Sequence, residues 1–189
     1  MKKQVLASAL LAIMSASALA ASDVYTIDPH HTWPIFAVNH LGYSTQRGRF
    51  DDTHGTVTLD FANKTGSVDL TIDTKSLDMG FAEWNEHLSG PAFFNVAQYP
   101  TMTFKSDKLI FDGDKVVGAD GKFTLLGVTR PLHVTVHNFH CGEHPMAHKM
   151  ACGGDITATI QRSDYGMKTY VPMVGDEVRI KVPVEAIKN

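Results

Sequence analysis

The sequence predicts an all-β protein, built as either a β-sandwich or an up-and-down barrel. The first observation is an alternation of apolar and polar residues with period two, which is typical of strands that bury one face. The alternation is clearest at 178–184 and at 68–72. The second observation is that turn residues separate such runs, at 63–66, 112–114, 120–121 and 153–154. About eight antiparallel strands at this spacing favour a sandwich or a barrel.

Seven of these strands can be located by their apolar face. In chain order they are marked by Val57 and Leu59; Val68, Leu70 and Ile72; Met102 and Phe104; Phe123 and Leu125; Leu132, Val134 and Val136; Ile156, Ala158 and Ile160; and Val178, Ile180, Val182 and Val184. Successive side chains of a strand point to opposite faces, so each set should face the interior.

Residues 79–100 break the alternation and predict a short helical segment. Phe81, Trp84 and Leu88 fall at positions i, i+3 and i+7, which share one face of a helix. A further turn begins at Pro91 and carries three more apolar residues, Phe93, Phe94 and Val96. Two interpretations are open. The segment is either a plug that fills one end of the β-domain or a lid over an apolar cavity, because long connections in compact β-domains are often functional.

The composition is that of an ordinary globular protein with one domain. The 189 residues are 43% hydrophobic and 20% charged, and the formal net charge is -3 at pH 7. A chain of this length buries about two-thirds of its unfolded surface, which is enough for a hydrophobic core. The slightly acidic balance argues against a nucleic-acid partner, because such a partner requires a basic face.

The N-terminus has the features of a cleavable signal peptide. Lys2 and Lys3 precede a short apolar run, and a small-x-small pattern ends at Ala20. We therefore expect a signal peptide at 1–20 and the mature domain at 21–189. The apolar run is too short for a permanent membrane anchor, which needs about 20 residues.

Export also bears on the two cysteines, Cys141 and Cys152. Disulfides form and persist in oxidising compartments, so we expect these cysteines to be joined to each other. The ten residues between them would then form a solvated hairpin loop. Closing a loop of this length stabilises a protein by about 3 kcal/mol through the unfolded state.

A histidine-rich segment, 137–150, is the alternative functional site. A helix would align its imidazoles, but Pro145 lies inside the segment and breaks a helix. In an extended chain His144, Met146 and His148 would share one face, and these soft ligands suit copper or zinc. The competing interpretation is the solvated hairpin described above, without a metal.

Sequence patterns for catalysis are not complete. Gly42 and Ser44 match the first half of a nucleophile elbow, but Gln46 stands where the second glycine is required. A helical zinc-protease motif needs glutamate after its first histidine, and His144 is followed by proline. We therefore expect a protein that is not an enzyme and that uses no cofactor.

Ordered short motifs resemble the YceI family over essentially the whole mature chain, from Tyr25 to Ile187. They are Phe36-x-Val38-x-His40-x-Gly42-x-Ser44, Gly48-x-Phe50, Ser76-Leu77-Asp78, His87-Leu88, Phe94, Tyr99-Pro100-x-x-x-Phe104, Gly121-x-Phe123-Thr124-Leu125-x-Gly127-Val128-Thr129-Arg130-Pro131 and Arg162-Ser163-Asp164-Tyr165-Gly166. The resemblance implies a periplasmic protein with a lipocalin-like, eight-stranded antiparallel up-and-down barrel and a short helical lid segment. It also implies binding, storage or transport of a polyisoprenoid or similar long-chain amphiphilic lipid.

The resemblance and the alternation together give candidate site residues. The lipid tail is expected to contact Phe36, Val38, Phe50, Val68, Leu70, Ile72, Phe104, Leu125 and Ile180 in the lumen. The portal is expected at Phe81, Trp84, Phe93 and Phe94, and a polar head group at His40, Arg47 and Arg49. The competing interpretation is that the inward side chains fill a solid core.

One departure from the family pattern concerns the head group. Relatives commonly carry an Arg-Asp pair where this chain has Trp84 and Asn85. If that pair seats a polar head group, this protein must use other residues or bind a different head group. The expected partners are a lipid and, for loading, a transient contact with a membrane. A homodimer is also compatible with the sequence.

Overall fold

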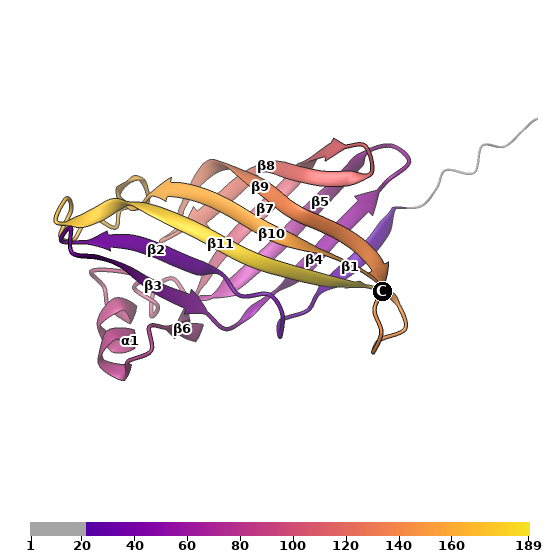
Figure 1. The fold of residues 1–189 in the computed structure, drawn as a ribbon. Coiled ribbons are helices and arrows are strands. Elements are labelled where there is room, and N and C mark those ends of the chain that lie inside the picture. The colour runs from indigo at the N-terminus through magenta and orange to yellow at the C-terminus, as the bar shows by residue number, and fades with distance from the viewer. Residues whose placement is uncertain (1–21) are drawn as a thin grey trace, which may run out of the picture.

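The computed structural model describes residues 22–189, which form a closed antiparallel barrel (Figure 1). Eight strands close it in the order β1-β4-β5-β7-β8-β9-β10-β11, and β11 pairs back onto β1. Their bounds are β1 Asp23–Ile27, β4 Thr53–Asp60, β5 Thr65–Asp73, β7 Thr101–Asp112, β8 Lys115–Leu125, β9 Val128–Glu143, β10 Met150–Gln161 and β11 Val174–Lys188. The structure thus confirms the eight-stranded antiparallel barrel.

Three further strands extend one end of this wall. β2 (Ile35–His40) pairs with the first half of β11, and β1 pairs with the last residues of β11. β1 and β2 therefore lie end to end along the same edge of β11. β3 (Ser44–Phe50) pairs with β2, and the two-residue β6 (Leu77–Asp78) pairs with β3. A short 3₁₀ turn, Thr74–Ser76, links β5 to β6, and a second one, Arg162–Tyr165, follows β10.

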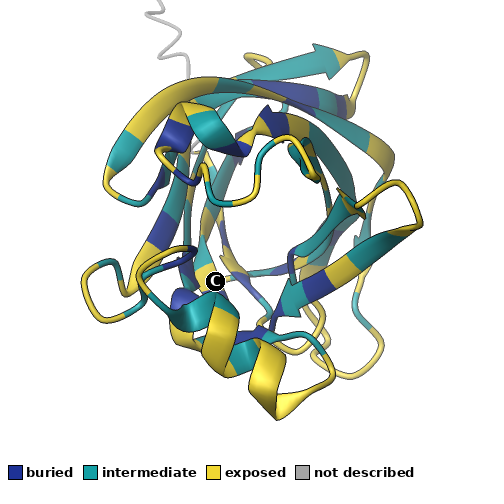
Figure 2. Cartoon of the chain, turned by 90° about the vertical axis from the view of Figure 1, so that its left-hand side faces the viewer, coloured by how far each residue is buried: buried dark blue, intermediate teal, exposed yellow. Residues whose placement is uncertain are grey.

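β6 is the last strand of the sheet. The helix α1 (Ala82–Ser89) lies beside the end of the barrel that β2, β3 and β6 extend (Figure 2). The segment that follows α1 forms turns instead of a second helix. It carries Phe93 and Phe94 into the core, where both are buried. The predicted short helix is therefore confirmed. No helix within 22–189 has the length and apolar character needed to cross a membrane.

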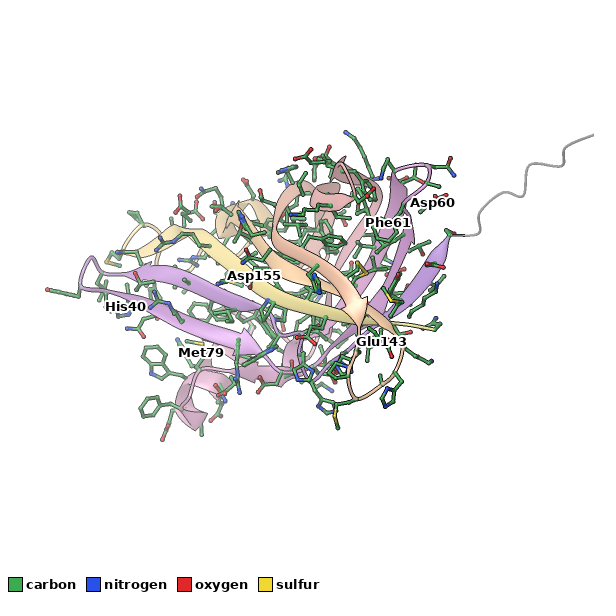
Figure 3. All side chains as sticks on the ribbon, turned by 45° about the vertical axis from the view of Figure 1, so that its right-hand side comes forward. His40, Asp60, Phe61, Met79, Glu143 and Asp155 are labelled. Carbon is green, nitrogen blue, oxygen red and sulfur yellow. A yellow bond between two sulfur atoms is a disulfide. The ribbon has the colours of Figure 1, made fainter. Side chains whose placement is uncertain are left out.

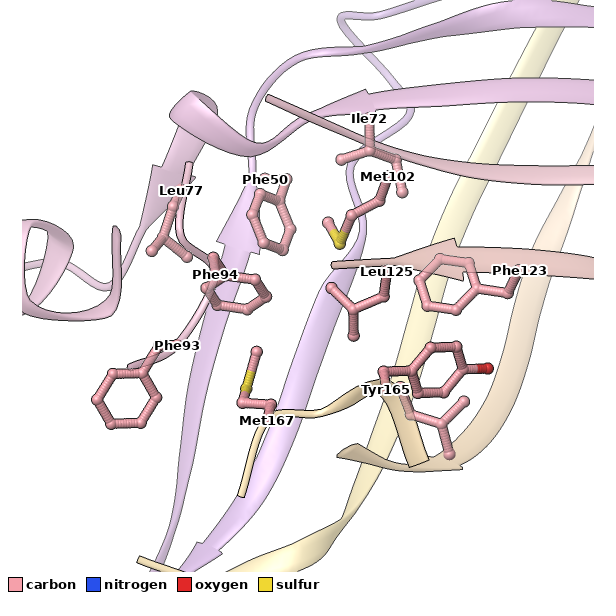
Figure 4. Close-up of a cluster of buried hydrophobic side chains, with 11 residues drawn as sticks. Phe50, Ile72, Leu77, Phe93, Phe94, Met102, Phe123, Leu125, Tyr165 and Met167 are labelled. Carbon is pink, nitrogen blue, oxygen red and sulfur yellow. The ribbon is translucent and has the colours of Figure 1, made fainter. Parts of the chain in front are cut away.

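Two clusters of buried side chains occupy the two ends of the barrel interior. The cluster beside α1 is built around Phe50, Phe94, Met102 and Met167 (Figure 4). Phe36 packs against it. The second cluster contains Tyr25, Ile27, Leu59, Val116, Cys152 and Ala186. The second cluster arises from the inward faces of strands, as the period-two pattern predicts, whereas the cluster beside α1 also contains Phe93, Phe94 and Met167 from the turns.

The predicted disulfide between Cys141 and Cys152 is confirmed. The two residues lie directly opposite each other on β9 and β10, with 4.1 Å between their Cα atoms. Cys152 belongs to the second cluster, so the disulfide joins the strands at the end of the barrel away from α1.

The strand prediction located seven of the eleven strands and missed β1, β2, β3 and the two-residue β6. β1, β2 and β3 were not among the alternating runs, because they are short or, as in β2, have intermediate exposure at most positions. The predicted signal peptide at 1–20 lies outside the described residues.

Candidate functional site

The barrel encloses a cavity of about 490 Å³ that extends between the two buried clusters. Its wall is almost entirely apolar, because each strand turns one face inward. All nine residues predicted for the lumen line the cavity, namely Phe36, Val38, Phe50, Val68, Leu70, Ile72, Phe104, Leu125 and Ile180. The interior is therefore hollow and is not a solid core.

The cavity meets solvent at the end beside α1, which we call the mouth. Within 22–189, the only cavity-lining residues that are exposed are Trp84, His87 and Tyr170. All three lie on α1 or on the loop that leads into β11. Figure 2 looks onto this end of the barrel, and Figure 3 places His40 and Met79 there, opposite Glu143.

The opposite end, which we call the closed end, is packed with apolar side chains. Phe61 lies 6.2 Å from Phe111 and 6.5 Å from Phe139 between ring centroids. These rings pack against the buried cluster of Tyr25 and Cys152. No lining residue of this end is exposed in the part of the chain that the structure describes.

Polar side chains enter the cavity wall chiefly at the mouth. Trp84 and His87 are three residues apart on α1 and so share one helical face. The Trp84 ring lies 6.4 Å from the ring of His40, the last residue of β2. Gln46 of β3 and Tyr170 complete this group. The mouth therefore combines aromatic surface with several hydrogen-bonding groups.

The loop at 166–173 is held against the mouth by Arg162. This side chain is 4% exposed and donates to the carbonyl oxygens of Met167, Thr169, Val174 and Gly175, at 2.9 to 3.1 Å. One buried guanidinium thus fixes both ends of the loop that carries Tyr170.

Burial and hydrogen bonding set the charges behind this loop. Burial lowers the pKa of Arg162, and the neighbouring Asp176 opposes that effect. Burial also acts to raise the pKa of Asp176, but hydrogen bonds from Ser163 outweigh it and the pKa lies below its usual 3.8. The Ser163 N–H and hydroxyl donate to the two Asp176 oxygens at 2.8 and 2.6 Å. Both groups therefore stay charged around neutral pH.

Comparison with known proteins assigns the chain to a family. Residues 25–186 match the YceI-like domain. The chain belongs to the YceI family. The protein YceI of Escherichia coli O157:H7 is 34% identical over 192 residues, and that of Salmonella arizonae is 33% identical, each with both chains fully covered.

Solved structures agree with this assignment. Burkholderia cenocepacia BcnA has a TM-score of 0.69 at 26% identity, covering 84% of this chain and 98% of that one. A Campylobacter jejuni YCEI protein has a TM-score of 0.69 at 24% identity, covering 80% and 90%. A polyisoprenoid binding domain from Saccharophagus degradans has a TM-score of 0.61 at 15% identity, covering 87% and 98%. The last two share the fold with this YceI-family chain.

The predicted portal residues separate into two groups. Trp84, Phe93 and Phe94 line the cavity at the mouth. Phe81 does not line it, because it precedes the first residue of α1 and its side chain is 68% exposed. Phe81 lies on the outer surface of the same end, and its role at the portal stays a prediction.

Two of the three predicted head-group residues lie outside the cavity. His40 lines the mouth, whereas Arg47 and Arg49 do not. The period of two explains this placement, because Gln46 and Phe50 of β3 face inward and the arginines between them face outward, and a head-group role for these arginines stays a prediction. Arg49 instead forms an ion pair with Asp51, with 2.7 Å between Nε and a carboxylate oxygen, and its guanidinium carbon lies 4.9 Å from the centroid of the Trp33 ring.

The two histidines of the 143–150 hairpin tip, His144 and His148, make local contacts. The His144 Nδ1 accepts hydrogen bonds from the backbone N–H groups of Met146 and Ala147, at 3.3 and 3.1 Å. His148 lies 3.9 Å from a carboxylate oxygen of Glu143, and both are exposed. Within 22–189, groups of three His, Cys, Asp or Glu ligands within 4.8 Å occur only at Asp28, His31 and Glu185. The predicted set of His144, Met146 and His148 includes a thioether sulfur, and copper or zinc binding by this set stays a prediction.

Several mouth residues were not predicted from the sequence. His87 and Arg162 belong to the motifs that resemble the YceI family, but no role was assigned to them. Gln46 could have been found from the alternation of β3, since it shares a face with Phe50. Tyr170 carries no sequence signal, because its position depends on a loop that Arg162 fixes from a distant part of the chain.

Proposed function

We propose that this chain binds a polyisoprenoid or a similar long-chain amphiphilic lipid in the barrel cavity, and stores or transports it in the periplasm after export. The protein acts as a binding protein and not as an enzyme. The observation that carries the proposal is the hollow, apolar cavity with one solvent-exposed mouth. Membership of the YceI family and the shared fold with a polyisoprenoid binding domain support it.

Simple energetics favour a long hydrocarbon as the ligand. Each methylene group moved from water into an apolar cavity contributes about 0.8 kcal/mol. Affinity can therefore come from chain length, without many polar contacts along the wall. Because the polar side chains gather at the mouth, the tail is expected to enter first and the head group to stay near Trp84 and His87.

We also propose that the mouth touches a membrane while the lipid is loaded. Six exposed large hydrophobic residues surround this end of the barrel, namely Leu41, Tyr43, Phe81, Trp84, Tyr170 and Met173. Tyrosine and tryptophan favour the boundary between lipid and water, where one part of the side chain is apolar and the other is hydrated. A lipid could then pass from a bilayer into the cavity without crossing bulk water.

Lipid extraction combined with a cavity-filling variant tests the main proposal. Purified protein is extracted with organic solvent and analysed by mass spectrometry, and binding of a fluorescent isoprenoid is titrated. Ala158 lines the cavity, so Ala158→Phe should fill space and weaken binding at least tenfold. Thr159→Phe is the matched control, because its neighbour Thr159 is exposed on the other face of β10.

The two variants separate ligand binding from folding. Circular dichroism and thermal unfolding should show that both variants keep the barrel. Absence of extractable lipid together with equal isoprenoid binding by the wild type, Ala158→Phe and Thr159→Phe would overturn the proposal.

A further inference from the structure

Three metal-ligating side chains meet where the loop between β1 and β2 lies against the C-terminal part of β11. Asp28 and His31 belong to this loop, and Glu185 belongs to β11. One ligand atom from each residue, a carboxylate oxygen or a ring nitrogen, lies within 4.8 Å of the other two. We propose that Asp28, His31 and Glu185 bind a divalent transition-metal ion of the zinc type, which joins the loop to β11.

The three side chains lie outside the lipid cavity. Val184 and Ala186 of β11 line the cavity, and successive side chains of a strand point to opposite faces, so Glu185 between them faces outward. Neither Asp28 nor His31 lines the cavity. The proposed metal site is therefore separate from the lumen and the mouth, and it does not depend on the proposed lipid binding.

Backbone hydrogen bonds fix the positions of these ligands. The Asp28 N–H donates to the Glu185 carbonyl oxygen at 2.9 Å, and the His31 N–H donates to the Asp28 carbonyl oxygen at 3.3 Å. Thr32 is fully buried, and its hydroxyl accepts a hydrogen bond from the Glu185 N–H at 3.1 Å. The loop and the strand are thus already held together, so an ion would bind with little loss of backbone freedom.

The distances between the ligand atoms suit one shared ion. One Asp28 carboxylate oxygen accepts a hydrogen bond from the His30 N–H, and the other lies 2.7 Å from the His31 Nδ1. The same Nδ1 lies 3.9 Å from a Glu185 carboxylate oxygen. Ligand atoms that share a tetrahedral zinc ion lie about 3.3 Å apart, which falls between these two distances. His31 and Glu185 are both at least half exposed, so their side chains have room for the small movements required.

The ligand types indicate which ions fit. An imidazole nitrogen with carboxylate oxygens suits zinc and other first-row transition metals, whereas calcium and magnesium take oxygen ligands. The two carboxylates balance the charge of a divalent ion, and three protein ligands leave a position for water. The pairing of β11 passes from β1 to β2 at this place, so a bound ion would connect the wall across the change of partner.

Thermal unfolding and calorimetric titration with zinc chloride test the proposal. Purified protein without a histidine tag is used in chelator-treated buffer. All variants carry His144→Gln/His148→Gln, which removes the histidines of the hairpin. In this background zinc should raise the melting temperature by several degrees, whereas magnesium should not, because an ion that binds only the folded state stabilises it. His31→Gln and Glu185→Gln should each weaken zinc binding about tenfold or more.

His54→Gln is the matched control. The His54 Nδ1 lies 3.7 Å from an Asp52 carboxylate oxygen and both side chains are exposed, but within 22–189 this pair has no third ligand. The variant should keep the zinc affinity of the background, and circular dichroism without zinc should show that all variants are folded. Equal zinc affinity in His31→Gln, Glu185→Gln and the background would overturn the proposal and leave an ion pair only. Equal stabilisation by zinc and magnesium would overturn it as well.

Discussion

The two ends of the barrel are built by different means. At the closed end, regular strand pairing carries Tyr25, Leu59 and Cys152 into a buried cluster, and the disulfide joins β9 to β10. At the mouth lie a helix, a short hairpin and a loop, and the loop is held by a single buried guanidinium. The closed end therefore depends on the inward face of each strand, whereas the mouth depends on a few specific hydrogen bonds.

Because of this difference, we expect substitutions at the closed end to affect stability and substitutions at the mouth to affect lipid binding as well. Apolar packing spread over many residues tolerates the loss of one contact, but a loop fixed by one side chain does not. Substitutions at the two ends should consequently have different effects on stability and on lipid binding.

The largest effect is expected from Arg162→Ala at the mouth. This change leaves four carbonyl groups without their donor, at residues 167, 169, 174 and 175. Loss of a buried, hydrogen-bonded charge of this kind costs about 3–5 kcal/mol. Urea unfolding should show the loss, and hydrogen exchange should show faster exchange of the amides at 166–174.

Arg179→Ala is the matched control, because Arg179 is an exposed arginine on β11. It should change the free energy of unfolding by about 0.5 kcal/mol or less. Arg162→Lys keeps the charge but not the fork of donors, so it should fall between the two. Equal stability of the Arg162→Ala and Arg179→Ala variants would contradict this account of the mouth.

The second effect is expected from Cys141→Ala/Cys152→Ala at the closed end. The disulfide spans eleven positions in sequence, and removing it should lower the free energy of unfolding by about 3 kcal/mol. Affinity for the isoprenoid should stay within about twofold of the wild type, because the mouth is unchanged. Thermal unfolding and ligand titration of the same samples measure both quantities. Faster hydrogen exchange at 166–174 in this variant would show that the two ends are coupled.

The third effect concerns the rate of loading and not stability. In Tyr43→Ser/Met173→Ser, two exposed apolar side chains of the mouth rim are removed. Transfer of a fluorescent isoprenoid from vesicles of phosphatidylethanolamine and phosphatidylglycerol should slow several-fold, with an unchanged equilibrium affinity. Met146→Ser is the control, since Met146 is 83% exposed on the hairpin of the closed end. Equal slowing by both variants would argue against a membrane contact confined to the mouth.

The contrast between the ends also explains what could be predicted from the sequence. Six of the nine lumen residues were located because a period of two assigns whole strands to one face, whereas Phe36, Val38 and Phe50 came from the motifs that resemble the YceI family. The same rule, applied to β3, would have turned Arg47 and Arg49 outward. The Tyr170 loop could not be predicted, because its position comes from hydrogen bonds to Arg162 that no local pattern records. The spacing of Phe81, Trp84 and Leu88 predicted that all three share one face of a helix, but the helix begins at Ala82 and Phe81 precedes it.

The smallest effect is expected at the junction between the two ends, in the loop that joins β1 to β2. The His31 ring lies 2.7 Å from a carboxylate oxygen of Asp28 and 3.9 Å from one of Glu185. The hydrogen bond with Asp28, and then the charge of Glu185, raise the pKa of His31 above 6.5. Burial acts to raise the pKa of Asp28, but hydrogen bonds from His31 and the His30 N–H outweigh it and lower the pKa below 3.8.

These opposite shifts define a pH window for the pair. The His31 contribution is fully present below about pH 6.5, the unfolded-state value, and is lost as the pH rises through the folded-state pKa. The Asp28 contribution is present above its unfolded-state value and is lost as the pH falls through the lowered pKa. Between about pH 5.5 and about pH 8.5 the melting temperature of the wild type should therefore fall more than that of His31→Gln or Asp28→Asn. The difference should be small because His31 is exposed to solvent, and equal falls in all three proteins would show that this pair does not stabilise the junction.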